Sequence, residues 1–355
     1  MSFQARVLAD SISPQGVRLV TVEKTYPRCI HAEEMTHRVF GRNSASTRAI
    51  PLKKQITNLL DNPFIPEKFG INEPGMQAWQ HLVGLKHEEA VRIWLQGRDR
   101  ALTTAIELLV GLKLAGEILR YDSFGDREYV RGDIISERLP EILAHVPSAE
   151  NHIDLSETSG LNVHKQLAGR GLEPYAWHTI IVTATEWDNY FALRDHKDAQ
   201  GEIATIARLT KQAFEESTPR KLKEGEWHLP LVNDGEFDNP LDGIKASAAR
   251  CAATSYNRQM AKRKFEDEMA RYSDLVKGGH MSPLEHQATP FSDAEVALRN
   301  MVGVNAIEGE GNRMHDISPL KISQICEQLQ FNGNLRGWNQ HRKDIQHESN
   351  FAMIA

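Results

Sequence analysis

The sequence has few cysteines and no long apolar run. Only three of its 355 residues are cysteines (Cys29, Cys251 and Cys326), too scattered for a CxxC pair, a disulfide framework or zinc-finger spacing. Such usage suits a reducing cytosol. No apolar stretch approaches the ~20 residues of a membrane span, and the N-terminal residues lack a signal-peptide pattern. We therefore expect a cytoplasmic protein without a membrane segment.

The sequence also lacks an excess of positive charge. Its formal net charge is -6, which argues against a protein that binds nucleic-acid polymers. Any anionic ligand must then be held by local clusters of arginine. The composition, 40% hydrophobic and 25% charged, is ordinary for a soluble globular protein, and no repeat or low-complexity segment is present. The length is sufficient for a large core.

The spacing of apolar residues predicts an α+β fold in which helices dominate. An alternating strand is expected over residues 17–26, and a short apolar run over 178–185 is typical of a buried strand or of a tight helix entry. Residues 121–156 are irregular and charged, which is typical of a surface insertion, and prolines and glycines over 219–243 indicate a long connection. Helices are expected over 27–40, 50–60, 77–119, 159–170, 185–194, 199–217, 246–256 and 260–277.

Residues 36–48 are the most informative segment. His37, Arg38 and Arg48 lie among hydroxyl and amide side chains that include Asn43 and Ser46, with little apolar material between them. Arginine forks with Ser and Asn donors match the geometry of a phosphate or a planar imide. This pattern predicts a binding site for an anionic, nucleotide-like molecule.

This segment resembles a signature of the flavin-dependent thymidylate synthases: Arg-His-Arg, seven residues, then Ser, with Asn three residues before the Ser and Arg two after it. The residues from His37 to Arg48 fall in that register. The sequence departs from the signature at Thr36, where the family has arginine, and at Ser44, where it has glutamate.

A second segment contains Asn189 and Arg194, five residues apart, on an expected helix that is otherwise aromatic. It resembles the family's Asn-Phe-Leu-x-Leu-Arg pattern, and residues 199–203 resemble the Ala-Gln-x-Glu-Ile stretch that follows. Asp198 stands where the family usually has histidine. Upstream, Arg170 begins a match to Arg-x-x-Leu-Pro. The alternative is a helix packed by its aromatic residues, with a terminal arginine that complements the helix dipole.

A third segment, residues 279–286, resembles the family's His-x-Thr/Ser-Pro-x-Glu-His and contains His280 and Ser282. Residues 249–256 resemble Ala-Ala-Arg-Val-Ser-Tyr. The His and Glu spacing fits neither HExxH nor a compact ligand set, so we expect no metal site. In the family this segment precedes the arginine-rich one. The resemblance therefore implies one circularly permuted domain over residues 1–355, with an insertion at 121–156 and an extension at 300–355.

The extension contains residues 334–343, which resemble the family's Arg-Gln-Trp-x-x-His-Arg helix. This second match lacks the Asn-x-x-Ser-x-Arg continuation, so we assign the signature to residues 36–48. Arg336, Gln340 or Arg342 could still contribute to a site. The alternative is a basic amphipathic helix that covers the core.

The resemblance implies a flavin-dependent thymidylate synthase fold with a small, mainly antiparallel sheet and long helices, assembled as a homotetramer. It implies reductive methylation of dUMP to dTMP with FAD, NADPH and 5,10-methylenetetrahydrofolate. Arg194 and Ser46 would be catalytic, and Ser46, Arg48, Arg170 and Arg194 would bind the substrate. The flavin contacts would be His37, Arg38, Asn43, Asn189, His280 and Ser282.

Two further interpretations stay open. Related flavin chemistry could hydroxymethylate dUMP or dCMP, since Thr36, Ser44 and Asp198 change the expected surroundings of flavin and base. A non-catalytic binder of flavin or nucleotide is the other. Cys29 lies where the family has an apolar residue, and we expect it to be a small buried side chain rather than a nucleophile.

Overall fold

A five-stranded sheet forms the centre of the molecule. The computed structural model describes residues 1–120, 130–145, 161–255, 264–309, 328–346 and 348. The strand order is β3-β4-β2-β1-β5, and every pairing is antiparallel except that of β1 with β5. The strands are β1 (Gln4–Ile12), β2 (Arg18–Pro27), β3 (Gly41–Ser44), β4 (Trp177–Ala184) and β5 (Arg220–Lys221). The strands expected over 17–26 and 178–185 are thus confirmed as β2 and β4, and the α+β class is confirmed.

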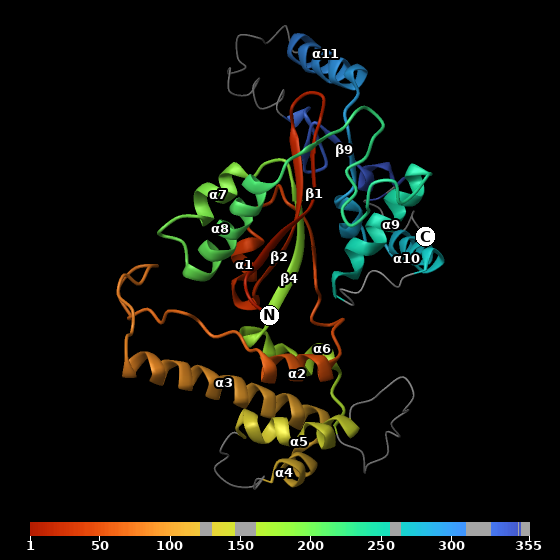
Figure 1. Cartoon of the computed structure of the whole chain (residues 1–355). Helices are drawn as coiled ribbons and strands as arrows, with labels where there is room; N and C mark the ends of the chain where they lie inside the picture. Colours follow the sequence, from red (N-terminus) through yellow and green to blue (C-terminus); the bar gives the residue numbers. More distant parts are fainter. Residues whose placement is uncertain (121–129, 146–160, 256–263, 310–327, 347, 349–355) are drawn as a thin grey trace.

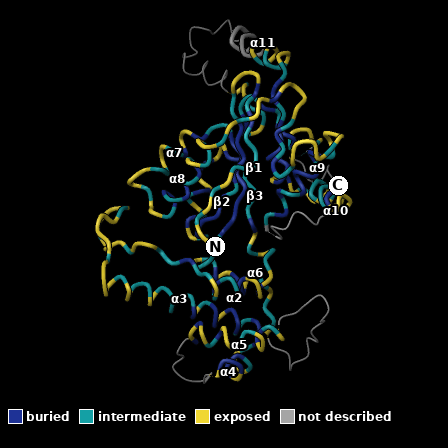
Figure 2. The backbone as a smooth tube through the Cα atoms, in the orientation of Figure 1, coloured by how far each residue is buried: buried dark blue, intermediate teal, exposed yellow. Residues whose placement is uncertain are grey.

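Strand β2 is buried on both faces. Val20 and Val22 pack on one side against Ile180 and Val182 of β4, while Leu19 and Thr21 are buried on the other side. A central strand with both faces covered reads as a continuous apolar run rather than as an alternation. Layers of structure therefore cover the sheet on both sides (Figures 1 and 2).

Helices α7 (Asp188–Arg194) and α8 (Gly201–Glu216) cover the first face (Figure 1). They confirm the helices expected over 185–194 and 199–217. The helix expected over 27–40 is largely wrong, because only η1 (Arg28–Ile30) and α1 (His31–Glu34) are helical there. Phe40 is buried against Trp187 and Tyr190. This contact brings the chain back to the sheet, where β3 begins at the next residue.

The C-terminal half covers the second face. It contains α9 (Pro240–Ala252), η3 (Ala253–Ser255), α10 (Phe265–Lys277), η5 (Ser282–Glu285) and β6 (Ala288–Pro290). Helix α11 (Asp293–Gly309) follows and lies beyond the end of the sheet (Figure 1). Helix α9 begins earlier than expected, because the Asn239 side chain caps it and Pro240 occupies the first turn. The helix expected over 260–277 is α10, and residues 256–263 lie outside the described part.

Residues 334–343 are not an amphipathic helix. They form β8 (Leu335–Arg336), β9 (Trp338–Gln340) and part of η6 (His341–Asp344), after β7 (Phe331–Asn332). Strand β9 pairs with β6, and Trp338 is fully buried in a cluster that includes Leu19. The reason is that the largest apolar side chain in this segment fills the core instead of lying on a helix surface. Residues 310–327 and 349–355 of the expected extension lie outside the described part.

A separate helical layer lies beyond the end of the sheet (Figure 1). It contains α2 (Leu52–Asp61), α3 (Leu85–Val110), α4 (Leu112–Leu119), α5 (Gly132–Ala144), α6 (Lys165–Ala168) and η2 (Arg170–Tyr175). Helix α2 confirms the helix expected over 50–60. The helix expected over 77–119 begins at Leu85 and is interrupted at Gly111, whose φ of 80° favours glycine. No helix in the described ranges is both long and apolar enough to span a bilayer.

The surface insertion expected over 121–156 is wrong where the chain is described. Helix α5 lies within it, and Ile135 and Ile142 are fully buried in the core of the helical layer. Residues 121–129 and 146–160 lie outside the described part. The helix expected over 159–170 is reduced to the single turn of α6, because residues 161–164 are not helical.

Candidate functional site

Segments that are far apart in sequence meet at strand β3. The Asn43 amide donates a hydrogen bond of 2.7 Å to the backbone carbonyl of Cys251 at the end of α9. A Cβ at Gly41 would lie 3.3 Å from the Cβ of Glu285, so the missing side chain allows η5 to approach. Gly41 also pairs with Thr183 of β4. Strand β3 thus joins parts of the first and third informative segments.

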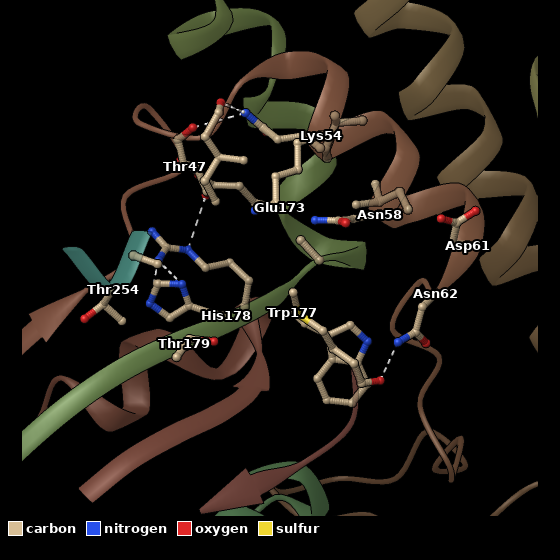
Figure 3. A pocket seen from close by; sticks show the side chains of 18 residues that line it. Thr47, Lys54, Asn58, Asp61, Asn62, Glu173, Trp177, His178, Thr179 and Thr254 are labelled. Carbon is tan, nitrogen blue, oxygen red and sulfur yellow. Dashed lines mark hydrogen bonds and ion pairs between the residues drawn. The ribbon is translucent and has the colours of Figure 1, made fainter. Parts of the chain in front are cut away.

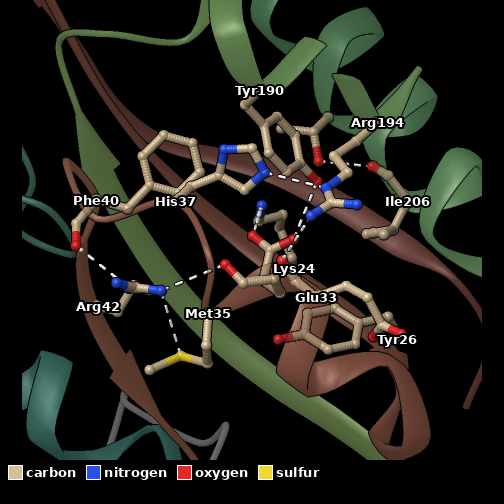
Figure 4. A network of polar contacts seen from close by, with 12 residues as sticks. Lys24, Tyr26, Glu33, Met35, His37, Phe40, Arg42, Tyr190, Arg194 and Ile206 are labelled. Atoms are coloured by element: carbon tan, nitrogen blue, oxygen red, sulfur yellow. Dashed lines mark hydrogen bonds and ion pairs between the residues drawn. The ribbon is translucent and has the colours of Figure 1, made fainter. Parts of the chain in front are cut away.

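Arg194 joins the first segment to the second. Its guanidinium donates to Nε2 of His37 at 3.1 Å, to Oγ1 of Thr36 at 2.8 Å and to the carbonyl of Glu33 at 3.3 Å (Figure 4). Burial, together with the Arg194 charge, lowers the pKa of His37. The His37 ring is therefore a neutral acceptor, and Tyr190 packs against it at 5.0 Å between ring centroids.

The α7 hollow lies beside this contact and has a volume of about 450 Å³. It brings together three of the residues expected to contact flavin: His37, Arg38 and Asn189. Arg38 and Asn189 are exposed, so their polar groups are accessible to a ligand. The hollow is lined by Thr36, His37, Arg38, Val39, Glu186, Asn189, Tyr190 and Leu193.

A buried ion pair lies under the contact between Arg194 and His37, and the sequence analysis missed it. Lys24 of β2 pairs with Glu34 of α1, and both side chains are fully buried. Tyr190 donates to the second oxygen of Glu34 at 3.1 Å, and the ammonium lies 4.3 Å from the Tyr190 ring centroid. The sequence feature that could have indicated this pair is a lysine on the otherwise apolar face of a strand, ten residues before a glutamate. This pair fixes α1, which contains Glu33 and leads directly into Thr36 and His37, the residues that hold Arg194.

The residues expected to bind the substrate phosphate form a second group. Glu173 accepts hydrogen bonds of 2.8 Å from both Thr47 and Arg170. This carboxylate thus brings Arg170 beside the segment that contains Ser46 and Arg48, both of which are exposed. The sequence analysis missed Glu173, although its place three residues after Arg170 predicts such an ion pair on a helix.

The α2 hollow, of about 350 Å³, opens beside this second group (Figure 3). Arg28 lies 3.0 Å from both ring nitrogens of His178, and Glu173 lies 3.8 Å from the same guanidinium. Burial, followed by the Arg28 charge, lowers the pKa of His178 well below its usual value. The hollow is lined by Met1, Arg28, Ala45, Thr47, Ile50, Lys54, Gln55, Asn58, Leu59, Asp61, Asn62, Leu172, Glu173, Ala176, Trp177, His178, Thr179 and Thr254.

The third segment reaches the sheet through residues other than those expected. His280 and Ser282 are exposed in the connection from α10 into η5. By contrast, Glu285 is packed against Gly41, and His286 is fully buried and hydrogen-bonded to Thr183 at 2.8 Å. Burial raises the pKa of Glu285, although Arg342 and Arg42 act in the opposite direction.

All three polar residues singled out in the C-terminal segment contact the other segments. Arg336 pairs with Glu186, a residue of the α7 hollow, at 2.5 Å. Gln340 donates to the carbonyl of Glu285 at 2.9 Å, and Arg342 pairs with its carboxylate. The C-terminal segment therefore holds Glu285 in place.

No family model, curated protein or solved structure matches the chain.

Cys29 is exposed, which corrects the expectation of a buried side chain. It follows the last paired residue of β2, where the chain leaves the core. Desolvation of the thiol, together with Glu202 and Glu33, raises its pKa to about 11, so the nucleophilic thiolate is disfavoured near neutral pH. In the described ranges, no three His, Cys, Asp or Glu side chains are grouped to bind a metal ion.

Proposed function

We propose that the chain is a flavin-dependent thymidylate synthase, with a permuted form of that fold, which converts dUMP to dTMP with NADPH and 5,10-methylenetetrahydrofolate. One observation carries the proposal: the three segments that resemble the family contact one another within a single chain, through β3 and through residues 33–37 before it. His37 contacts Arg194, Asn43 contacts the end of α9, and Gly41 contacts Glu285. A chance resemblance gives no reason for such segments to meet.

The donors and acceptors beside the α7 hollow fit a flavin ring system. A guanidinium, an amide and an imidazole from Arg38, Asn189 and His37 would hold FAD there. Nearby, Oε2 of Glu33 is a buried acceptor without a partner in the described part, which suits a ligand with an imide N–H. When bound, FAD would accept hydride from NADPH and pass the reducing equivalents to the one-carbon unit.

The chain's own residues would bind and orient the nucleotide. Ser46, Arg48 and Arg170 would hold the phosphate, with Arg170 oriented by Glu173. Arg194 would stabilise the negative charge that develops on the pyrimidine imide, since contacts with Thr36 and Glu33 already fix its guanidinium. Arg194 and Arg170 belong to separate clusters, and a homotetramer would let clusters of different subunits complete one site.

The visible absorption spectrum of the purified protein, followed by turnover, tests the proposal. We expect bound flavin, oxidation of NADPH that depends on dUMP and methylenetetrahydrofolate, and a product with the mass of dTMP. Arg194→Ala is expected to lower kcat on the order of 10²- to 10³-fold, as for the loss of a charge-stabilising donor. The control is Arg208→Ala, which removes an exposed arginine from α8 and should leave turnover unchanged.

The product mass separates the alternatives. A product heavier than dTMP by one oxygen would assign hydroxymethylation of dUMP, and turnover of dCMP would change the substrate. A colourless protein that binds dUMP without oxidising NADPH would refute the synthase and leave a nucleotide binder.

A further inference from the structure

A continuous chain of buried hydrogen bonds crosses the sheet on its second face. Oγ of Ser11 lies 2.9 Å from Nδ1 of His228, whose Nε2 lies 2.8 Å from Oγ1 of Thr21. Thr21 continues to Oγ1 of Thr183 at 2.6 Å, and Thr183 continues to Nδ1 of His286 at 2.8 Å. All five side chains are buried. Every link is short enough for proton transfer along a hydrogen bond.

The two ends of this chain lie in different surroundings. Ser11 lines the β1 hollow, an open cavity of about 830 Å³ between β1 and the loop that precedes α9. At the other end, Nε2 of His286 is buried and has no hydrogen-bond partner in the described part. His286 follows Glu285, which packs against β3. The chain thus runs from an open hollow at the surface to the place where the informative segments meet.

Every member of the chain can both donate and accept. Burial lowers the pKa of His228 and of His286 to about 3, so both rings are neutral near pH 7 and carry one N–H and one lone pair. In one arrangement all donors point the same way: Ser11 to His228, His228 to Thr21, Thr21 to Thr183, and Thr183 to His286. The reverse arrangement is equally complete, so the chain has two states.

The geometry points to a proton relay, Ser11–His228–Thr21–Thr183–His286, that connects the β1 hollow with the interior beside β3. Delivery of the proton to a bound nucleotide or flavin rests on the proposed function; conduction along the chain does not.

The relay step conserves atoms and charge. Water in the β1 hollow gives a proton to Oγ of Ser11 and is left as hydroxide, while the Ser11 proton moves to Nδ1 of His228. The Nε2 proton of His228 moves to Thr21, the Thr21 proton to Thr183, and the Thr183 proton to Nδ1 of His286. His286 then releases its Nε2 proton to a basic group of a bound nucleotide or flavin. With the water and this acceptor included, six O–H or N–H bonds have formed while six have broken.

The sheet itself provides a matched control. Thr25 and Thr179 form a second cross-strand hydroxyl pair at 3.0 Å, on the same two strands and also buried, but outside the relay. Thr21→Val removes one link at nearly constant volume, and Thr25→Val makes the same change where no relay passes. Thr21→Ser keeps the hydroxyl, and Thr183→Val breaks the neighbouring link should Thr21→Val fail to fold.

The experiment measures exchange of the His286 Nδ1–H with solvent deuterium in the full chain labelled with ¹⁵N-histidine, with no flavin or nucleotide added. This ring proton faces Thr183, so it can leave and return along the relay without an acceptor at Nε2. We expect at least tenfold slower exchange in Thr21→Val and in Thr183→Val. Thr21→Ser and Thr25→Val should exchange at the wild-type rate. The ¹⁵N shifts of the wild type should also show the same tautomer at His228 and His286, because both arrangements require it.

Unchanged exchange in Thr21→Val, equal slowing in Thr25→Val, or opposite tautomers at the two histidines would overturn the relay. These measurements need no turnover, so the two proposals can fail separately. If the variants show the expected slowing of exchange but the protein has no flavin chemistry, only the synthase is refuted. If the protein has synthase activity but Thr21→Val exchanges at the wild-type rate, only the relay is refuted.

Discussion

A single buried charge pair determines how the candidate site is supported. Lys24 and Glu34 are both fully buried, and Phe40, Trp187 and Tyr190 surround the ammonium at 4.3 to 5.6 Å from their ring centroids. A buried pair adds little net stability, but removal of one partner leaves an uncompensated charge in the core. The pairing of Glu34 with Lys24 therefore keeps α1 in its position next to Arg194.

Lys24→Met is expected to lower the free energy of unfolding by about 3–5 kcal/mol, because it leaves the Glu34 carboxylate without its partner. The double variant Lys24→Met/Glu34→Met should recover most of that loss. Denaturant unfolding measures both values.

The control is Arg6→Ala, which breaks an exposed ion pair with Glu23 on the same strand as Lys24. Its cost should stay within about 1 kcal/mol. Similar losses in Lys24→Met and Arg6→Ala would contradict the importance of the buried pair.

At the scale of elements, the C-terminal strand β9 is part of the core rather than a cover. Trp338 is fully buried, and its indole N–H donates to the carbonyl of Val17 at 3.3 Å. Two residues later, Gln340 holds the backbone of Glu285. Strand β9 thus connects the centre of the sheet with the third informative segment.

Trp338→Ala is expected to cost about 3–5 kcal/mol of unfolding free energy, since it removes a large core side chain. Thermal and denaturant unfolding test this. Trp79→Ala is the control, because Trp79 is 63% exposed before α3 and its loss should change stability little. An equal cost for both variants would contradict the burial of β9.

Helix α5 gives a second test at this scale. Ile135→Ala should lower the unfolding free energy by about 2–5 kcal/mol, because Ile135 is fully buried in the helical layer. Ile93→Ala, at a position of α3 that is 56% exposed, should cost less than about 0.5 kcal/mol. Denaturant midpoints compare the two variants. An Ile135→Ala variant with unchanged stability would contradict the burial of α5 and support the surface insertion expected from the sequence.

Local patterns were sufficient for β2, β4, α2, α7 and α8, because their apolar spacing is set by neighbours within each segment. They failed for α1, α5 and residues 334–343. There the conformation depends on distant partners such as Trp187, which packs on Phe40, or Leu19, which packs near Trp338. The spacing of Arg170 and Glu173 indicates their ion pair, but the contact of Glu173 with Thr47 and the pairing of Lys24 with Glu34 depend on how the chain folds.

At the scale of the whole molecule, buried histidines lie beside the apolar cluster between the sheet and its C-terminal layer. His228 and His286 lie there with the pKa of each lowered to about 3 by burial. The pKa of an unfolded histidine is about 6.5. The native state binds no proton at either ring between these values, whereas the unfolded chain does. This contribution to stability is therefore complete above about pH 6.5 and is lost as the pH falls towards 3.

The free energy of unfolding is expected to fall by roughly 2–3 kcal/mol per buried histidine between pH 6.5 and 4.5. Denaturant unfolding at several pH values measures the slope. His228→Asn should reduce the slope, whereas His145→Asn, at an exposed position, should not change it. If His228→Asn leaves the pH dependence of the unfolding free energy unchanged, other groups than His228 cause the loss of stability in acid.

The contact between Trp338 and Val17 also has a consequence for biosynthesis. The two residues are 321 positions apart, yet they close the same part of the core. After β1 and β2 have left the ribosome, most of the chain must still be synthesised before Trp338 is available to pack against them. Until then the nascent strands expose Leu19 and its neighbours, so the newly made polypeptide should depend on chaperones that shield apolar surface.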